Sequence, residues 1–117
     1  MTTITINTAD LIGNALDFAV AKALGHAGPA PRYSTDWALT GPLLIEHGIG
    51  FFRNGKRVYA NEGKRWEANR TVNLDEAPIL RHGYRAHGPD PLVASLRCLV
   101  LSRLGETVAV PANLVEA

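Results

Sequence analysis

The chain has 117 residues, of which 46% are hydrophobic and 20% are charged, and its formal net charge is +1. These values predict a single folded domain over residues 1–117 and exclude a disordered chain. Cys98 is the one cysteine, which excludes an internal disulfide and, with four scattered histidines, argues against a metal site. We therefore expect no metal and no cofactor.

Two further features bear on location. The N-terminal residues have neither the basic segment nor the apolar core of a signal peptide. No apolar run approaches the roughly 20 residues that cross a bilayer. A cytoplasmic protein with no membrane association is the expectation.

The first predicted element is a main helix within residues 7–25. Asn7 or Thr8 is the expected N-cap, and Gly25 is the expected end. Apolar residues recur at helical spacing and form one broad stripe. Lys22 falls inside this stripe, which predicts either an ammonium group that extends to water or a cation directed into a pocket.

The next predicted element is a helical turn followed by a short helix that ends at Gly48, with Pro42 at the first helical position. Its first residues combine aromatic rings, hydroxyls and a carboxylate: Tyr33, Ser34, Thr35, Asp36 and Trp37. One interpretation is a capped, partly buried helix start. The other is the lip of a binding site, because free helix amides and hydroxyls suit a phosphate-bearing ligand.

A hairpin is predicted next, with strands at 49–53 and 56–60 joined by Asn54-Gly55, a dipeptide that favours a type I′ turn. In that register Phe51 opposes Val58 on the core face. Residues 65–70 give a third strand, and residues 77–88 give a less regular fourth. The ligand candidates on these strands are Phe52, Arg57, Tyr59 and Trp66, because rings beside cations can stack a base and pair a phosphate. The alternative is a solvated or subunit-covered sheet face.

The second main helix is predicted between Asp90, as cap, and Gly105, as end, with Pro91 in its first turn. Its apolar residues extend almost all the way round. This pattern predicts a helix buried on most sides or shared with a partner chain, and hence a homodimer or larger homo-oligomer. A short edge strand is expected before Pro111.

Arg97 and Arg103 lie within the apolar surface of that last helix. A buried unpaired charge costs several kcal/mol, so Arg97 needs an acceptor. One prediction is an ion pair between Arg97 and Asp36. The other is that Lys22, Arg97 and Arg103 converge on a pocket that binds an anion.

Together these elements predict an α+β fold. A three- to four-stranded antiparallel sheet carries two main helices and one short helix on one face. Residues 51–87 hold eight of the twelve Lys and Arg residues but only four of the eleven acids, so one surface is expected to be basic. The low net charge and the apolar last helix argue against duplex DNA as a partner.

Sequence motifs do not indicate an enzyme. The sequence has no Gly-rich phosphate loop, no His-Glu metal motif and no nucleophile elbow. We therefore expect a non-catalytic protein whose candidate partner is a nucleotide-like small-molecule anion.

Four segments, in order, resemble the NinX-like family of small phage and prophage proteins: DFAVAKALG, YSTDWALTGPLLIEHGI, RWEA and GPDPLVASLRCLVLSRLGETVAVPANL. The resemblance covers most of the chain and is weakest around residues 53–64. It implies a phage accessory protein in the cytoplasm of an infected or lysogenic bacterium, and it implies no catalytic residues. Our leading hypothesis is that the protein binds and sequesters a nucleotide-type signalling molecule of an antiphage defence system. The alternative is a protein–protein interaction module that uses an apolar helix surface.

Overall fold

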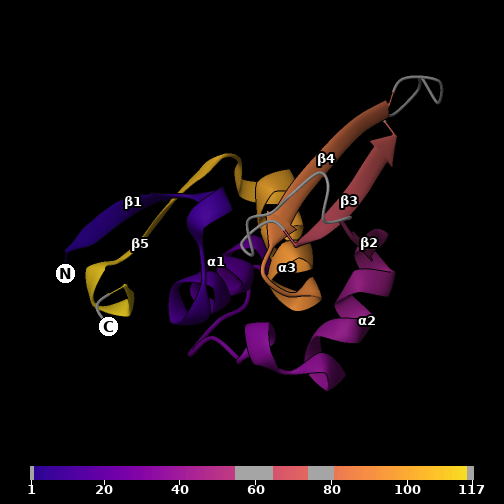
Figure 1. Ribbon diagram of the computed structural model, residues 1–117. Coiled ribbons are helices and arrows are strands. Elements are labelled where there is room, and N and C mark those ends of the chain that lie inside the picture. The colour runs from indigo at the N-terminus through magenta and orange to yellow at the C-terminus, as the bar shows by residue number, and fades with distance from the viewer. Residues whose placement is uncertain (1, 55–64, 74–80, 116–117) are drawn as a thin grey trace.

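The computed structural model describes residues 2–54, 65–73 and 81–115 (Figure 1). Three α-helices are described in these residues: α1 (Gly13–Leu24), α2 (Trp37–His47) and α3 (Pro91–Leu104). The described strands are β1 (Thr3–Asn7), β2 (Ile49–Arg53), β3 (Trp66–Asn73), β4 (Arg81–Gly88) and β5 (Thr107–Pro111). Short 3₁₀ turns lie at Thr8–Asp10 (η1), Tyr33–Thr35 (η2) and Ala112–Leu114 (η4).

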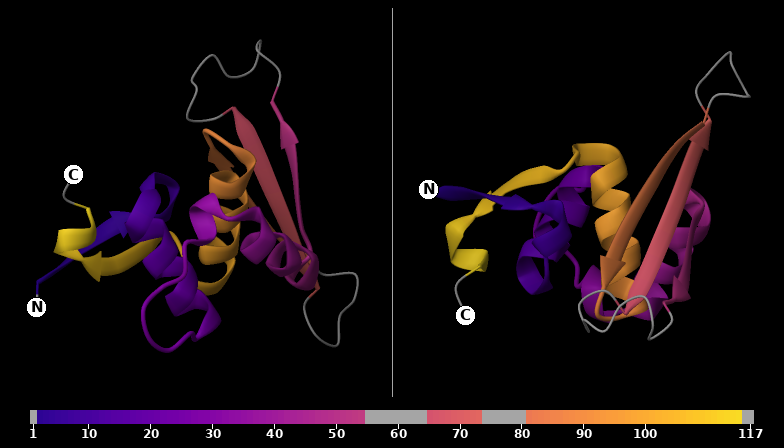
Figure 2. Two further views of the ribbon diagram at one scale, coloured as in Figure 1. Left: turned by 90° about the horizontal axis from the view of Figure 1, so that it is seen from below. Right: turned by 45° about the horizontal axis from the view of Figure 1, so that its top comes forward.

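The described strands form two antiparallel sheets. The larger has the order β2-β3-β4, with Ala68 of β3 opposite Phe51 of β2 and opposite Ala86 of β4. The smaller pairs β1 with β5, so that Thr3 faces Pro111. The described helices lie on one face of the three-stranded sheet (Figure 2), which confirms the predicted α+β fold. The β1–β5 sheet was not predicted.

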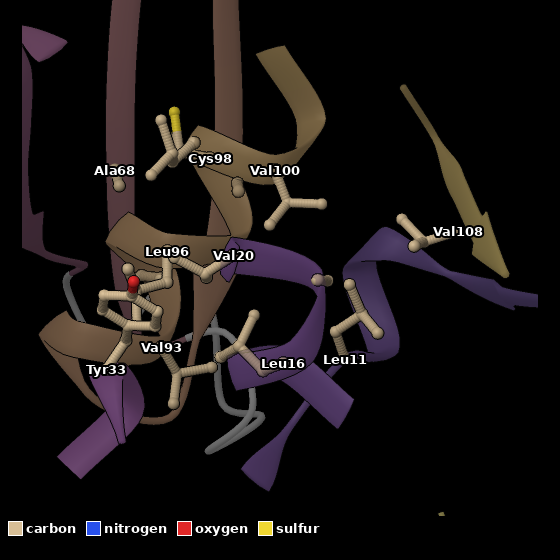
Figure 3. Close-up of a cluster of buried hydrophobic side chains, with 14 of the residues drawn as sticks. Leu11, Leu16, Val20, Tyr33, Ala68, Val93, Leu96, Cys98, Val100 and Val108 are labelled. Carbon is tan, nitrogen blue, oxygen red and sulfur yellow. The ribbon is translucent and has the colours of Figure 1, made fainter. Parts of the chain in front are cut away.

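Helix α3 lies at the centre of the molecule, between the three-stranded sheet and α1 (Figures 1 and 2). Nine consecutive residues, 92–100, are buried, and Leu96, Leu99 and Val100 are fully enclosed. They form a continuous core with Leu16 and Val20 of α1 (Figure 3). The apolar pattern of α3 is therefore satisfied within its own chain and requires no second subunit. The homo-oligomer stays a prediction.

The start of the first helix was predicted wrongly. Residues 3–7 form β1 rather than leading into a cap, and α1 begins at Gly13. The backbone N–H of Thr8 donates to the carbonyl of Glu106 at 2.8 Å, and its hydroxyl donates to the carbonyl of Gly105 at 2.6 Å. Because Thr8 makes these long-range bonds, it does not cap the helix. The predicted end is confirmed, since Gly25 is left-handed at φ 69°.

The start of α2 is also earlier than predicted. Asp36 caps the helix, with its Oδ1 accepting from the N–H of Leu39 at 3.2 Å. Pro42 therefore lies inside α2 and not at its first position, contrary to the prediction. Gly48 ends the helix in the left-handed conformation at φ 65°, as predicted.

For the strands and the last helix, the predictions agree more closely with the structure. The predicted strands at 49–53 and 65–70, the fourth strand and the edge strand before Pro111 correspond to β2, β3, β4 and β5. The predicted hairpin partner at 56–60 lies outside the described residues. In α3, Asp90 Oδ1 accepts from the N–H of Val93 at 2.8 Å, Pro91 is the first residue and Gly105 follows the last, all as predicted.

Candidate functional site

A cavity of about 340 Å³ opens where the β4 edge, α3 and the β1–η1 junction meet. We call it the β4–α3 pocket. Two arginines, a histidine and a glutamate are among its lining residues, which are Asn7, Thr8, Ala9, Arg85, Ala86, His87, Arg97, Leu101 and Glu106. A volume of this order is sufficient for a small ligand. Three chain segments form it, within residues 7–9, 85–87 and 97–106.

Arg97 is the buried cation of this pocket, with only 7% of its surface exposed. Its Nε donates to the carbonyl of Leu11 at 2.8 Å, and its Nη1 donates to the carbonyl of His87 at 2.9 Å. Burial lowers the pKa of Arg97, while the charges of Asp10 and Asp90 raise it. Among the described residues, no carboxylate lies within ion-pair distance of its guanidinium group. Neutral carbonyls therefore hold a positive charge that has no close counterion.

The predicted ion pair between Arg97 and Asp36 is wrong. Asp36 is exposed and caps α2, whereas Arg97 uses backbone carbonyls. Lys22 is exposed on α1, and the Nε of Arg103 donates to the carbonyl of Ala23 at 2.8 Å. Neither Lys22 nor Arg103 lines the β4–α3 pocket. The predicted convergence of the three cations is therefore reduced to Arg97 alone.

Two pocket residues that the sequence interpretation missed come from β4. Arg85 is exposed, and its Nε lies 3.6 Å from Oε2 of Glu67, a weak ion pair that leaves it able to move. The Nε2 of His87 lies 3.0 Å from Oε1 of Glu67, its cross-strand neighbour. The alternation of side chains along residues 81–88 places Arg85 and His87 on the same face, which is the signal that could have identified them.

The YSTDW segment is anchored by hydrogen bonds to residues of α1 and α2. The N–H of Ser34 donates to Oδ1 of buried Asp17 at 2.7 Å, and the hydroxyl of Thr40 donates to the carbonyl of Tyr33 at 2.6 Å. Burial raises the pKa of Tyr33, and the charge of Asp17 raises it further. Tyr33 and Ser34 are buried, whereas Thr35 and Asp36 are exposed. The segment thus has the geometry of a capped helix start, and its role as a ligand lip stays a prediction.

Two aromatic candidates, Trp37 and Trp66, contact the ring of Phe51 on β2, the strand at the opposite edge of the sheet. The ring centroid of Phe51 lies 5.8 Å from that of Trp37 and 5.9 Å from that of Trp66. Trp37 and Phe51 are 48% and 38% exposed. We call these three rings the aromatic cluster. Phe52, 48% exposed, lies on the other face of β2, and Arg57 and Tyr59 lie outside the described residues.

Cys98 is a core residue. Its side chain is fully buried, and its thiol donates to the carbonyl of Tyr84 at a distance of 3.7 Å. Burial raises the pKa of the thiol to about 12. The thiol is therefore neutral at physiological pH and is not a nucleophile in the folded protein.

The fold and this geometry define a small α+β protein whose pocket holds a buried cation without a close counterion. The family described as "Bacteriophage P22, NinX" matches residues 7–103, and the chain belongs to this family. The resemblance inferred from the sequence is thus confirmed. No curated protein matches the chain. In the part of the chain that the structure describes, none of the helices has the length and apolar character needed to cross a membrane.

Proposed function

We propose that this phage protein is a non-catalytic binder that sequesters a nucleotide-type signalling molecule of an antiphage defence system. It acts in the cytoplasm of the infected or lysogenic host. The observation that carries the proposal is Arg97, a cation buried in the β4–α3 pocket and held only by carbonyl oxygens.

The physical argument is electrostatic. A buried charge without a counterion is unfavourable, so an anion that enters the pocket is bound strongly by Arg97. Two of the three guanidinium nitrogens are used by Leu11 and His87, and Nη2 has no hydrogen-bond acceptor among the described residues. Nη2 is available to a phosphate oxygen. Arg85, bound only weakly to Glu67, adds a second positive charge at the β4 edge of the pocket.

Sequestration requires binding without chemistry, and the pocket side chains suit that role. Arginine stays protonated at physiological pH and acts through charge and hydrogen bonds. The imidazole of His87 is engaged by the carboxylate of Glu67. These contacts support a binding site built for affinity.

The test is direct capture of the ligand. Purified protein is incubated with an extract of bacteria whose nucleotide-signalling defence is active, then washed, denatured and analysed by mass spectrometry. We expect an intact nucleotide in stoichiometric amount. A cleaved product would indicate an enzyme, and the absence of any nucleotide across several defence types would overturn the proposal.

A matched pair of variants ties the captured ligand to the pocket. Arg85→Ala removes an exposed arginine at the β4 edge, and Arg53→Ala removes an exposed arginine from β2 at the other edge. We expect Arg85→Ala to lower the captured amount at least fivefold and Arg53→Ala to leave it unchanged. Equal losses would indicate a non-specific charge effect.

A second candidate function is docking to a host or phage protein. The observation that favours it is the exposure of large apolar side chains on α2 and β2: Ile45 is 85% exposed, Trp37 is 48% exposed and Phe51 is 38% exposed. Exposed apolar and aromatic residues are typical of interaction surfaces. In this case Ile45→Ser would abolish capture of a specific partner, and Arg85→Ala would leave that capture intact.

A further inference from the structure

We infer that the β4–α3 pocket recognises a ribonucleotide in preference to its 2′-deoxy counterpart. Arg97 holds the phosphate, Arg85 adds positive charge at the edge of the pocket, and Glu106 accepts hydrogen bonds from the ribose hydroxyls. This inference rests on the proposed function and specifies the class of ligand.

The spacing of residues along α3 separates the two charges. Arg97 and Leu101 are four residues apart and both line the pocket, and Glu106 follows the helix end at Gly105. At 1.5 Å per residue, Arg97 and Gly105 are about 12 Å apart along the helix axis. Leu101 lies between them, and no ion pair joins the described side chains of Arg97 and Glu106. The pocket thus has a cationic end, an apolar middle and a carboxylate end.

The backbone of Glu106 is fixed, although its side chain is exposed. Gly105, at φ 94°, ends α3, and its N–H donates to the carbonyl of Leu101 at 3.1 Å. Thr8 then donates to the carbonyls of both Gly105 and Glu106. These bonds fix the backbone from which the Glu106 side chain extends at the edge of the pocket.

The hydrogen-bonding chemistry of the Glu106 carboxylate defines which part of a ligand it can contact. An ionised carboxylate only accepts hydrogen bonds and repels a phosphate, so it suits the part of a ligand that donates. In a nucleotide the nearest such groups beyond the phosphate are the ribose hydroxyls, and an acidic residue at the 2′-hydroxyl is a recurring means of ribose recognition. The side-chain amide of Asn7, in the same lining, can donate to one hydroxyl oxygen and accept from another. A 2′-deoxynucleotide lacks one of the donors that Glu106 requires.

The experiment compares the affinities of the four ribonucleoside 5′-monophosphates with those of their 2′-deoxy counterparts by calorimetry. It uses the full chain as wild type, as Glu106→Gln and as Glu46→Gln, the last being a control that changes an exposed glutamate of α2. We expect wild type and Glu46→Gln to bind the ribonucleotides about tenfold more tightly than the deoxynucleotides. In Glu106→Gln the preference for ribonucleotides should fall from about tenfold to about threefold or less.

The outcomes separate the two levels of the argument. If ribonucleotides and deoxynucleotides bind wild type equally, or if Glu106→Gln keeps the tenfold ratio, the ribose inference is overturned and nucleotide binding stands. If Glu106→Gln instead removes a preference among bases, Glu106 faces the base and the ribose inference is again overturned. If none of the eight nucleotides binds at millimolar concentration, both the inference and nucleotide binding at this pocket are overturned.

Discussion

The two edges of the three-stranded sheet differ in the kind of side chain they carry and in how far it is buried. At the β4 edge the cation of Arg97 is buried and held by backbone carbonyls. Its position is therefore fixed, and its charge is only weakly screened by solvent. At the β2 edge the large apolar groups are partly exposed and contact one another mainly through their rings.

This difference separates two kinds of recognition. A buried charge in a small pocket selects an anion by electrostatics and size. Exposed rings on a helix and a strand suit a broad, apolar partner surface. The two candidate functions therefore lie at different edges, and substitutions at one edge should leave the other intact.

The largest expected effect is at the β4 edge. Arg97→Met keeps most of the side-chain volume but leaves the carbonyls of Leu11 and His87 without their donor. Unsatisfied buried acceptors cost about 1–3 kcal/mol each, partly offset by removal of a buried charge, so we expect a loss of about 2 kcal/mol in the free energy of unfolding. Urea denaturation measures it, with exposed Arg53→Met as a control near zero. Wild-type stability in Arg97→Met would contradict a stabilising role for the hydrogen bonds of Arg97 to these two carbonyls.

The aromatic cluster should matter less. Trp37→Ala removes a half-exposed ring that contacts Phe51, and we expect a loss of about 1–1.5 kcal/mol. Phe52→Ala is the matched control, because Phe52 is equally exposed and contacts no ring among the described aromatic residues. Denaturation curves should show a smaller loss for Phe52→Ala, and calorimetry should show unchanged nucleotide affinity in both variants. A weaker nucleotide affinity in Trp37→Ala would mean that the two edges are coupled.

The helix caps test whether the edges differ in local stability. Asp36→Ala removes the cap of α2, on the β2 side, and Asp90→Ala removes the cap of α3, which follows β4. Each should lower the free energy of unfolding by about 1 kcal/mol, and the corresponding Asn variants should retain most of it. Thermal melts of the four variants measure this. A much greater loss in Asp90→Ala would show that its carboxylate also stabilises Arg97.

The smallest effect is expected within α3. The hydroxyl of Ser95 is fully buried and has no hydrogen-bond partner among the described residues. Ser95→Ala should therefore be neutral or raise the free energy of unfolding by up to about 1 kcal/mol. Ser102 is the contrast, because its hydroxyl donates to the carbonyl of Leu99 and accepts from Nη1 of Arg70. Ser102→Ala should destabilise the protein, and equal effects of the two variants would contradict this account.

Local features of the fold were predictable because they depend on neighbouring residues. The ends of α1 and α2 at Gly25 and Gly48, and the start of α3 at Asp90, follow from capping chemistry within a few residues. Strand β1 was missed because its partner lies about a hundred residues away, at β5. The alternating β-branched residues of TITIN were the signal available for it.

The candidate site was predictable only in part, for the same reason. Arg97 stood out as a cation on an apolar helix, and the structure places it in a pocket. Its acceptors, the carbonyls of Leu11 and His87, lie 86 and 10 residues away in the sequence. Backbone carbonyls carry no side-chain signature, so a carboxylate partner was predicted in their place. Glu106 was missed because only the tertiary structure brings the end of α3 together with the β1–η1 junction.

The position of Cys98 gives the protein a built-in reporter of its own motions. This thiol lies between α3 and β4, and alkylating reagents cannot reach it or find it ionised while the two elements stay packed. Its labelling rate therefore measures how often the helix separates from the strand, as hydrogen exchange does for an amide. The pocket is lined by residues of these same two elements, α3 and β4, so a bound ligand contacts both. Slower labelling of Cys98 in the presence of a nucleotide would thus report occupancy of the pocket without any added probe.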